Sequence, residues 1–406
     1  MSPNETLTAH PHGRQIKLLL QAALLIFAYT VVIGILNGTD LVEFEHKTLL
    51  THVHTGTLGW ITTSVFAAAL WLFGGTPAPG WRDSFARVLP LATIVAVIAY
   101  NITFLTTFGS GRPTIGGFML LVSVGWVAWI FGSMRASVLS VPRLGILAAV
   151  LTLTLGGLLG VLLGIMIATG NEILPGEAYA SHPATMVIGF LIPVGMALAE
   201  WNVRPELLDQ KASRAGWFQI GLPFVGGILV TAGLLADSPP LLSLSLPFEV
   251  IGVGILVARL WPGMRRLDSA GAGPSFVAAP TVVWLVLNIV FFIYLIARFQ
   301  GDFGEARVGL ILALDHMMFI GVMSNALFAQ VRAAAPGAKP AAVRVLFYLM
   351  NAGLAGFILG LLADTAILKQ ISTPIMGLGI LHGIVLFTMA LQRGPTTPAP
   401  APAPAA

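Results

Sequence analysis

Five histidines are the residues of this chain best placed to bind a metal or a cofactor. His52, His54, His182, His316 and His382 lie within or at the start of long apolar stretches. Ionisable side chains at membrane depth are costly to bury and usually have a function. The chain has no cysteine, which excludes iron–sulfur clusters and thiolate-bound metals. Imidazole is therefore the ligand to consider, although a lone buried histidine more often serves only as a hydrogen-bonded packing residue.

The spacing of the histidines suggests more than one binding site. His52 and His54 are two residues apart, so on a regular helix their side chains point about 200° apart. They would serve two sites on opposite faces of that helix, unless His52 is merely hydrated at the membrane interface. His10, His12 and His46 lie outside the apolar stretches; we expect His10 and His12 to be solvated in the N-terminal tail and assign no role to His46.

A weak internal repeat relates the histidine-bearing stretches. Six residues separate His52 from Gly59 and His182 from Gly189, and four separate His54 from Gly59 and His316 from Gly321. The stretches recur every four apolar segments. This pattern predicts three four-helix units around a pseudo-threefold axis.

The segments that carry the histidines are expected to be transmembrane helices. Hydrophobic residues make up 56% of the 406 residues and charged residues only 9%, whereas soluble domains have roughly 25% charged residues. Lipid must therefore replace water around most of the chain. The net charge of +4 is spread over many loops, which argues against a nucleic-acid partner. The fold class predicted is all-α, with about twelve spans at 16–36, 49–73, 87–108, 114–132, 144–169, 181–200, 217–236, 242–260, 276–297, 309–330, 343–363 and 375–392.

The distribution of basic residues predicts the orientation. With the N-terminus in the cytoplasm, sixteen of the 21 Lys and Arg residues fall in cytoplasmic segments, as the positive-inside rule requires. The first apolar run is expected to be a retained helix and not a cleaved signal peptide. We therefore expect a multi-pass protein of the inner (plasma) membrane, with a cytoplasmic tail at 1–15, a membrane domain at 16–392 and a disordered Pro/Ala-rich tail at 393–406. The five remaining basic residues fall in outer loops: Lys47, Arg112, Arg298, Arg307 and Lys369.

Two short motifs resemble those of a known superfamily. The sequence Leu50-Thr51-His52-Val53-His54 to Trp60 resembles the His-x-His helix of cbb3-type haem–copper oxidases, in which two histidines of one helix ligate two haems. The layout of twelve helices with histidines on the second, sixth and tenth is similar to that of oxidase subunit I. The length, and the segment from Asp315-His316 to Met323, resemble the NnrS family of haem- and copper-containing membrane proteins linked to nitric oxide stress.

The resemblance implies a divergent haem-binding relative and not a complete oxidase. The seventh predicted span has no histidine pair to complete a copper site. The function implied is a haem-binding, or haem- and copper-binding, membrane redox protein in respiratory electron transfer or in nitric oxide or oxygen chemistry. If it is an enzyme, it would be an oxidoreductase related to subunit I of cytochrome c oxidase or nitric oxide reductase. Its partners would be the lipid bilayer, a small gas such as NO or O2, and an electron-donor protein or quinol.

The resemblance and the spacing together assign residues to two sites. His54 and His316 are expected to hold a low-spin b-type haem, because both stand at the same distance before a glycine and because the resemblance implies that the second and tenth helices flank such a haem. His52 and His182, with His382 and the intramembrane Glu249 as further candidates, would form a second cofactor or metal site. Glu249 is equally well explained as a proton-relay group or a protonated packing residue. Arg298 and Arg307 are candidates to pair with haem propionates, although each is also a good interfacial anchor, and Asp315 is expected to orient His316 or to pair elsewhere.

Two other functions fit the sequence. Twelve helices with cytoplasmic termini are also typical of secondary transporters, in which His, Asp and Glu would form a site without haem near Pro247 or Pro280. A structural membrane protein whose histidines only pack is the third interpretation. Haem absorption of the purified protein separates the first function from the other two.

Overall fold

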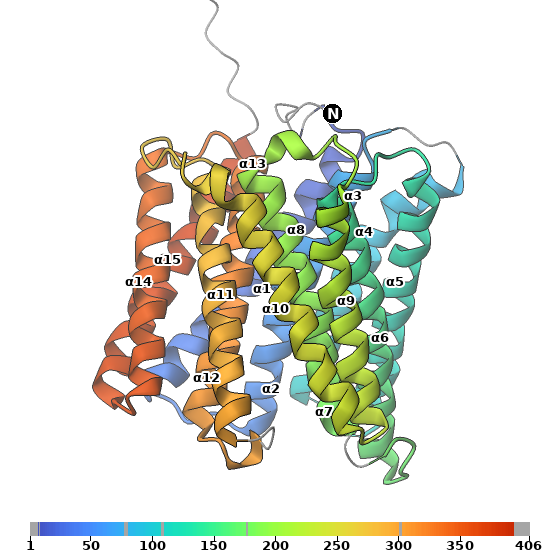
Figure 1. The fold of residues 1–406 in the computed structure, drawn as a ribbon, viewed down its shortest axis with the longest axis vertical. Coiled ribbons are helices and arrows are strands. Elements are labelled where there is room, and N and C mark those ends of the chain that lie inside the picture. The colour runs from blue at the N-terminus through green and yellow to red at the C-terminus, as the bar shows by residue number, and fades with distance from the viewer. Residues whose placement is uncertain are drawn as a thin grey trace, which may run out of the picture.

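The fold is a bundle of long helices, shown in Figure 1. It was obtained as a computed structural model, which describes residues 7, 9–76, 80–106, 109–175, 178–299 and 303–393. The regular structure in these ranges is helical throughout, without a strand. Twelve helices are long and apolar enough to cross a membrane. This confirms the all-α polytopic fold predicted from the sequence.

Nine of the spans are single continuous α-helices. They are α1 (Gly13–Gly38), α4 (Trp81–Thr106), α5 (Gly111–Met134), α6 (Val141–Thr169), α9 (Arg214–Leu235), α10 (Pro239–Met264), α11 (Pro274–Phe299), α14 (Pro340–Leu362) and α15 (Ala366–Arg393). Short 3-10 turns occur at η3 (Pro205–Leu207) and η4 (Phe303–Glu305).

The other three spans each contain a π-helical segment, and we call them inner spans 1, 2 and 3. Inner span 1, His46–Phe73, consists of α2 (His46–His54), η1 (Thr55–Thr62) and α3 (Thr63–Phe73). Inner span 2, Ala178–Val203, consists of α7 (Ala178–Ala184), η2 (Thr185–Leu191) and α8 (Ile192–Val203). Inner span 3, Val308–Ala334, consists of α12 (Val308–His316), η5 (Met317–Ser324) and α13 (Asn325–Ala334).

The inner spans form the centre of the bundle. Their most apolar windows are 78%, 83% and 61% buried, whereas those of the other nine helices are at most 50% buried. The π-helical segment η5 contacts both η1 and η2, and the Trp60 indole donates to Ser324 Oγ at 3.2 Å across the contact between spans 1 and 3. Wide π-helical turns are rare and often mark functional sites. Here they follow His54, His182 and His316 within three residues.

Proline explains part of this irregularity in inner span 2. Pro193 has no N–H to donate to the carbonyl of Gly189, one turn earlier. The Thr152 hydroxyl on α6 donates to that carbonyl instead. The freed backbone group is thus satisfied by the neighbouring helix.

Glycines reveal the threefold repeat. Gly59, Gly189 and Gly321 lie at corresponding points of the three π-helical segments. Each is packed against the helix that precedes its span: a Cβ on them would meet Ile26 of α1, Thr152 of α6 and Trp284 of α11 within about 2.3 to 3.1 Å. The chain therefore consists of three four-helix units, α1–α5, α6–α10 and α11–α15, arranged as the sequence predicted.

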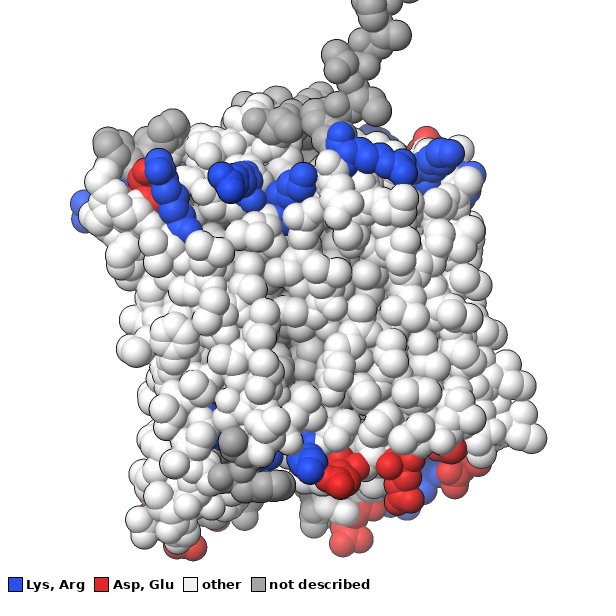
Figure 2. Space-filling model, turned by 180° about the vertical axis from the view of Figure 1, so that it is seen from behind, with Lys and Arg blue, Asp and Glu red and all other residues white. Residues whose placement is uncertain are grey.

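The surface is that of a membrane protein. In Figure 2 a broad uncharged band separates an end of the bundle with mainly basic side chains from an end with acidic side chains and a few basic ones. We call the basic end, where α1 starts and α15 ends, the basic face, and the other end the opposite face. The alternation of the twelve spans places the same sixteen Lys and Arg residues on the basic face.

One predicted boundary is wrong by more than two turns. The last span begins at Ala366 and not at residue 375, because Pro374 is accommodated inside α15 without ending it. The predicted tail at 393–406 lies outside the described residues apart from Arg393, as does most of the segment before Ala9.

Candidate functional site

A cavity of about 460 Å³ lies between inner spans 1 and 3 in the half of the bundle next to the opposite face. Its walls come from α1, α2 and η1, α12 and η5, α14 and α15. Such a volume is within the usual range for small-molecule and cofactor sites. His52 and His316 both line this cavity, one on each inner span.

Both histidines are held by one ring nitrogen. His52 Nδ1 is 2.9 Å from the carbonyl oxygen of Thr30 on α1, and His316 Nδ1 is 2.7 Å from the carbonyl oxygen of Leu312 one turn earlier. A carbonyl oxygen only accepts, so each Nδ1 must carry the proton and donate it. In the neutral imidazole the Nε2 lone pair then remains available. This is the arrangement of metal-binding histidines, in which a backbone partner fixes the ring and the tautomer.

The rest of the cavity is mainly apolar. Aromatic side chains of Phe27, Trp60, Phe319 and Phe357 line it, and the Phe357 ring lies 4.8 Å from the His316 ring, centroid to centroid. Such walls suit a flat hydrophobic ligand. Asp315 is the acidic side chain of the inner spans that lines the cavity.

An ion pair lies at the mouth of the cavity. Lys369 Nζ, on the first turn of α15, is 2.7 and 2.9 Å from the two carboxylate oxygens of Asp40. Hydrogen bonds from Lys369 and Gln370 hold the pKa of Asp40 below its ordinary value. Asp40 and Lys369 are cavity-lining residues, so a cation is available there for an anionic substituent of a ligand.

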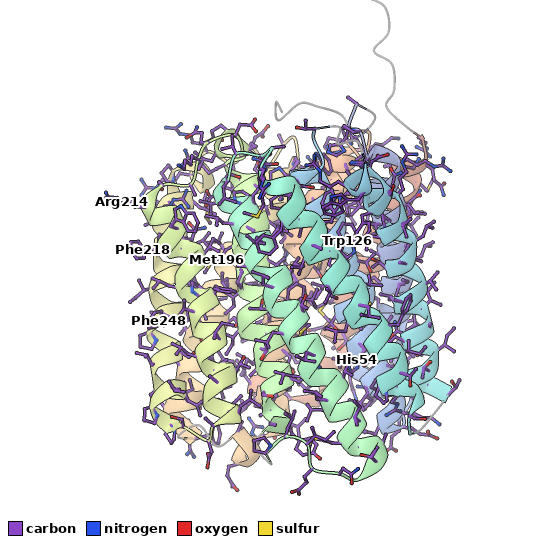
Figure 3. The ribbon with its side chains drawn as sticks, turned by 90° about the vertical axis from the view of Figure 1, so that its right-hand side faces the viewer. His54, Trp126, Met196, Arg214, Phe218 and Phe248 are labelled. Carbon is purple, nitrogen blue, oxygen red and sulfur yellow. The ribbon has the colours of Figure 1, made fainter. Side chains whose placement is uncertain are left out.

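His54 and His182 are anchored in the same way but away from this cavity. His54 Nδ1 donates to Leu50 O at 2.7 Å, and the ring stacks on Phe104 of α4 with centroids 4.4 Å apart. His182 Nδ1 donates to Gly156 O on α6 at 2.8 Å. Figure 3 shows His54 in the half of the bundle remote from the basic face.

The histidines that share the cavity are not the pair predicted from the sequence. The spacing to glycine paired His54 with His316, but the cavity brings His316 together with His52. The reason is the threefold repeat itself. His54 and His316 occupy equivalent positions, so a rotation relates their side chains and each faces outward toward its own α4 or α14 neighbour, Phe104 or Phe357. His52 and His182 are likewise equivalent, and both rings face back toward the preceding helix, α1 or α6.

The structure also separates His382 and Glu249 from the other candidates. Because α15 begins at Ala366, His382 lies about 24 Å along it, in the half near the basic face, and its Nε2 is hydrogen-bonded to Ala342 O at 3.0 Å. Glu249 of α10 accepts a hydrogen bond from Ser245 and lies beside Gly226 of α9. Within the described ranges, no three His, Asp or Glu residues are close enough to hold a metal ion.

The two arginines considered as propionate partners have other contacts. Arg307 forms an ion pair with Asp364 at 2.9 Å, and the Arg298 guanidinium lies over the Phe299 ring. Neither lines the cavity. The basic residue at the mouth is Lys369, which was predicted from the sequence only to lie in an outer loop.

A buried charged cluster near the basic face was not predicted from the sequence. Arg259 of α10 contacts Glu200 of α8 through two nitrogens, at 2.6 and 2.8 Å, and both side chains also bond Gln219 of α9. Glu200 is fully buried. Its partner is 59 residues away in the chain, so sequence spacing gives no signal for the pair. It joins α8, α9 and α10.

His10 and His12 are buried, contrary to the expectation of a solvated tail. They are 5% and 7% exposed, because their rings fill the space beside Gly74. His10 Nε2 lies 3.2 Å from the carbonyl oxygen of Trp71, and its Nδ1 accepts the His12 N–H at 3.1 Å. Both ring nitrogens of His10 therefore have hydrogen-bond partners only when its imidazole is neutral. Burial lowers the pKa of His10 from 6.5 to about 4 and also lowers that of His12.

Acidification should therefore loosen the N-terminal segment. A histidine whose pKa is lower in the folded than in the unfolded state destabilises the fold as pH falls from 6.5 toward 4. For His10 the loss amounts to about 3 kcal/mol when complete. Thermal unfolding in detergent should show wild type losing more stability between pH 7.5 and 5 than His10→Asn. Parallel pH profiles for the two proteins would contradict this assignment.

No protein-family model matches this chain, and no curated protein does so either.

Proposed function

We propose that this protein is a membrane haem protein in which His52 and His316 would hold a haem in the cavity between inner spans 1 and 3. The observation that carries the proposal is the shared anchoring of these side chains: each Nδ1 is fixed by a backbone carbonyl, which leaves each Nε2 lone pair for the cavity. His382 provides the contrast, since its Nε2 is already used.

The remaining cavity residues fit the same group. Aromatic walls would contact the faces and edges of the macrocycle, and Lys369 at the mouth would pair with a propionate in exchange for Asp40. Copper is not part of the proposal, because the described residues contain no cluster of three suitable ligands.

The ligand pair favours electron transfer over gas binding at this cavity. Haem iron supplies a reversible one-electron couple. If His52 and His316 both hold the iron, NO or O2 would have to displace one of these anchored imidazoles in order to bind. The protein's own contribution is to hold both rings in place and to exclude water with apolar walls. The electron donor would be a quinol in the membrane or a redox protein at the opposite face.

The absorption spectrum of the purified protein tests this function. We expect a Soret band and the sharp visible bands of a reduced low-spin haem, with haem released by acid-acetone or detected as its pyridine complex. A well-folded, monodisperse protein that stays colourless and does not bind added haemin would overturn the proposal. That result would favour the transporter interpretation, with Asp315 in the same cavity as its ionisable group.

The orientation is also a proposal: the basic face lies in the cytoplasm of a plasma membrane, as the positive-inside rule requires. The chain has no cysteine, so single cysteines can be labelled without background. Glu43→Cys, in the exposed loop on the opposite face, should react with an impermeant maleimide in intact cells. Ala136→Cys, exposed on the basic face, should react only after permeabilisation. The reverse pattern would invert the topology.

A further inference from the structure

We propose that His54 of inner span 1 and His182 of inner span 2 form a second bis-imidazole haem site, beside α4, α5 and α6. This inference rests on the proposed function of the first cavity. It is carried by the threefold repeat, which relates the surroundings of the two pairs residue by residue.

The ligands of the two pairs are equivalent under the repeat. Aligned on Gly59, Gly189 and Gly321, His52 corresponds to His182, and His54 corresponds to His316. The contacts agree with this alignment. His52 and His182 both donate to a carbonyl of the preceding helix, Thr30 or Gly156, and each ring packs beside a glycine one turn further along, Gly34 or Gly160.

The other member of each pair repeats in the same way. His54 and His316 both donate Nδ1 to the carbonyl four residues earlier, at 2.7 Å in each case. Both rings pack on a phenylalanine of the next helix, Phe104 on α4 or Phe357 on α14. Each pair thus combines one histidine of each kind, from two different inner spans. His52 lies within electrostatic reach of His316, and His54 within reach of His182.

A basic residue lies at the corresponding end of each pair. Lys369, on the first turn of α15, lines the mouth of the first cavity. Arg112, on the first turn of α5, lies over the Phe104 ring at 4.2 Å, donates to Phe104 O at 3.0 Å and acts electrostatically on His54. Both sites therefore offer a cation for an anionic edge of a ligand whose face meets the imidazoles.

The third equivalent position lacks every one of these features. It would lie between inner spans 2 and 3, where Ala184 and Leu314 replace the two histidines. Asn288, the counterpart of Thr30 and Gly156, donates to the carbonyl of Leu314 at 2.8 Å. The first turn of α10, Pro239 to Leu242, has no basic residue. Histidine pair and cation are thus present together at two positions and absent together at the third, as expected if they serve one ligand class.

Haem stoichiometry of wild type and variants tests this proposal. The ratio of haem to polypeptide should be two in wild type and one in His54→Ala or His182→Ala. The double variant His54→Ala/His182→Ala should also keep one haem, because its two changes remove the same site. The cross-pair double variant His54→Ala/His316→Ala should keep none. His382→Ala is the matched control and should keep two.

The outcomes separate this proposal from the first one. A retained low-spin spectrum in His54→Ala and His182→Ala shows that these variants are folded and that the His52–His316 site is intact. One haem in wild type, unchanged by either variant, would overturn the second site and leave the first. Loss of a haem in His54→Ala but not in His182→Ala would overturn the pairing. Colourless wild type would overturn both.

Discussion

Replacing His316 by glycine should remove low-spin haem binding from the cavity between inner spans 1 and 3. In the proposed site the imidazole of His316, in the cavity wall, would be one of the two ligands. Loss of an outer-shell partner of a metal ligand typically costs roughly 10–100-fold in affinity, and we expect a larger loss for a ligand itself. Spectral titration of the haem-depleted protein with haemin measures the change. His52→Gly should behave in the same way.

Added imidazole distinguishes lost ligation from lost folding. Glycine leaves space where the ring was, so millimolar imidazole should restore the low-spin spectrum of His316→Gly. His382→Gly should need no rescue, because its Nε2 faces the carbonyl of Ala342 and not the cavity. A His316→Gly protein with the wild-type spectrum before imidazole is added would rule out this residue as a ligand.

The largest loss of stability should follow from breaking the buried Glu200–Arg259 pair. Glu200→Leu leaves the Arg259 guanidinium, 18% exposed, next to Gln219 without its carboxylate. Removing one partner of a buried ion pair typically costs about 3–5 kcal/mol, because the other charge stays buried. Denaturant-induced or thermal unfolding in detergent should show this loss while the haem spectrum at low temperature remains unchanged.

Two variants serve as controls for that prediction. The double variant Glu200→Leu/Arg259→Leu should recover much of the stability, since no unpaired charge remains. Asp83→Asn breaks the exposed pair of Asp83 with Arg87 and should cost less than about 1 kcal/mol. If Glu200→Leu costs no more than Asp83→Asn, the cluster does not hold α8, α9 and α10 together.

Periodic information in the sequence was sufficient for the overall fold. Apolar stretch lengths, loop charges and the recurring histidine–glycine spacings each repeat along the chain, so they predicted twelve spans in three units. The direction in which each histidine side chain points from its helix was harder to predict. Equal distances to glycine identify equivalent residues, and equivalent residues of a threefold repeat do not face each other. The cavity accordingly brings His316 together with His52 and not with its equivalent, His54.

Contacts between distant segments account for the remaining differences. Lys369 reaches the cavity mouth because α15 starts nine residues earlier than predicted, through Pro374. Glu200 meets Arg259 only after α8 and α10 have packed together. The π-helical turns have a visible cause only at Pro193, whose missing N–H was readable in the sequence but did not by itself indicate a wide turn.

Near-infrared magnetic circular dichroism of the oxidised protein, combined with low-temperature electron paramagnetic resonance, tests the central claim most directly, because it identifies the axial ligands of a low-spin haem. We expect a bis-imidazole signature that His52→Gly and His316→Gly both abolish at the first site. Methionine ligation, which the cavity-lining Met376 would permit, or a high-spin haem in wild type would contradict the assignment of His52 and His316 as the ligand pair.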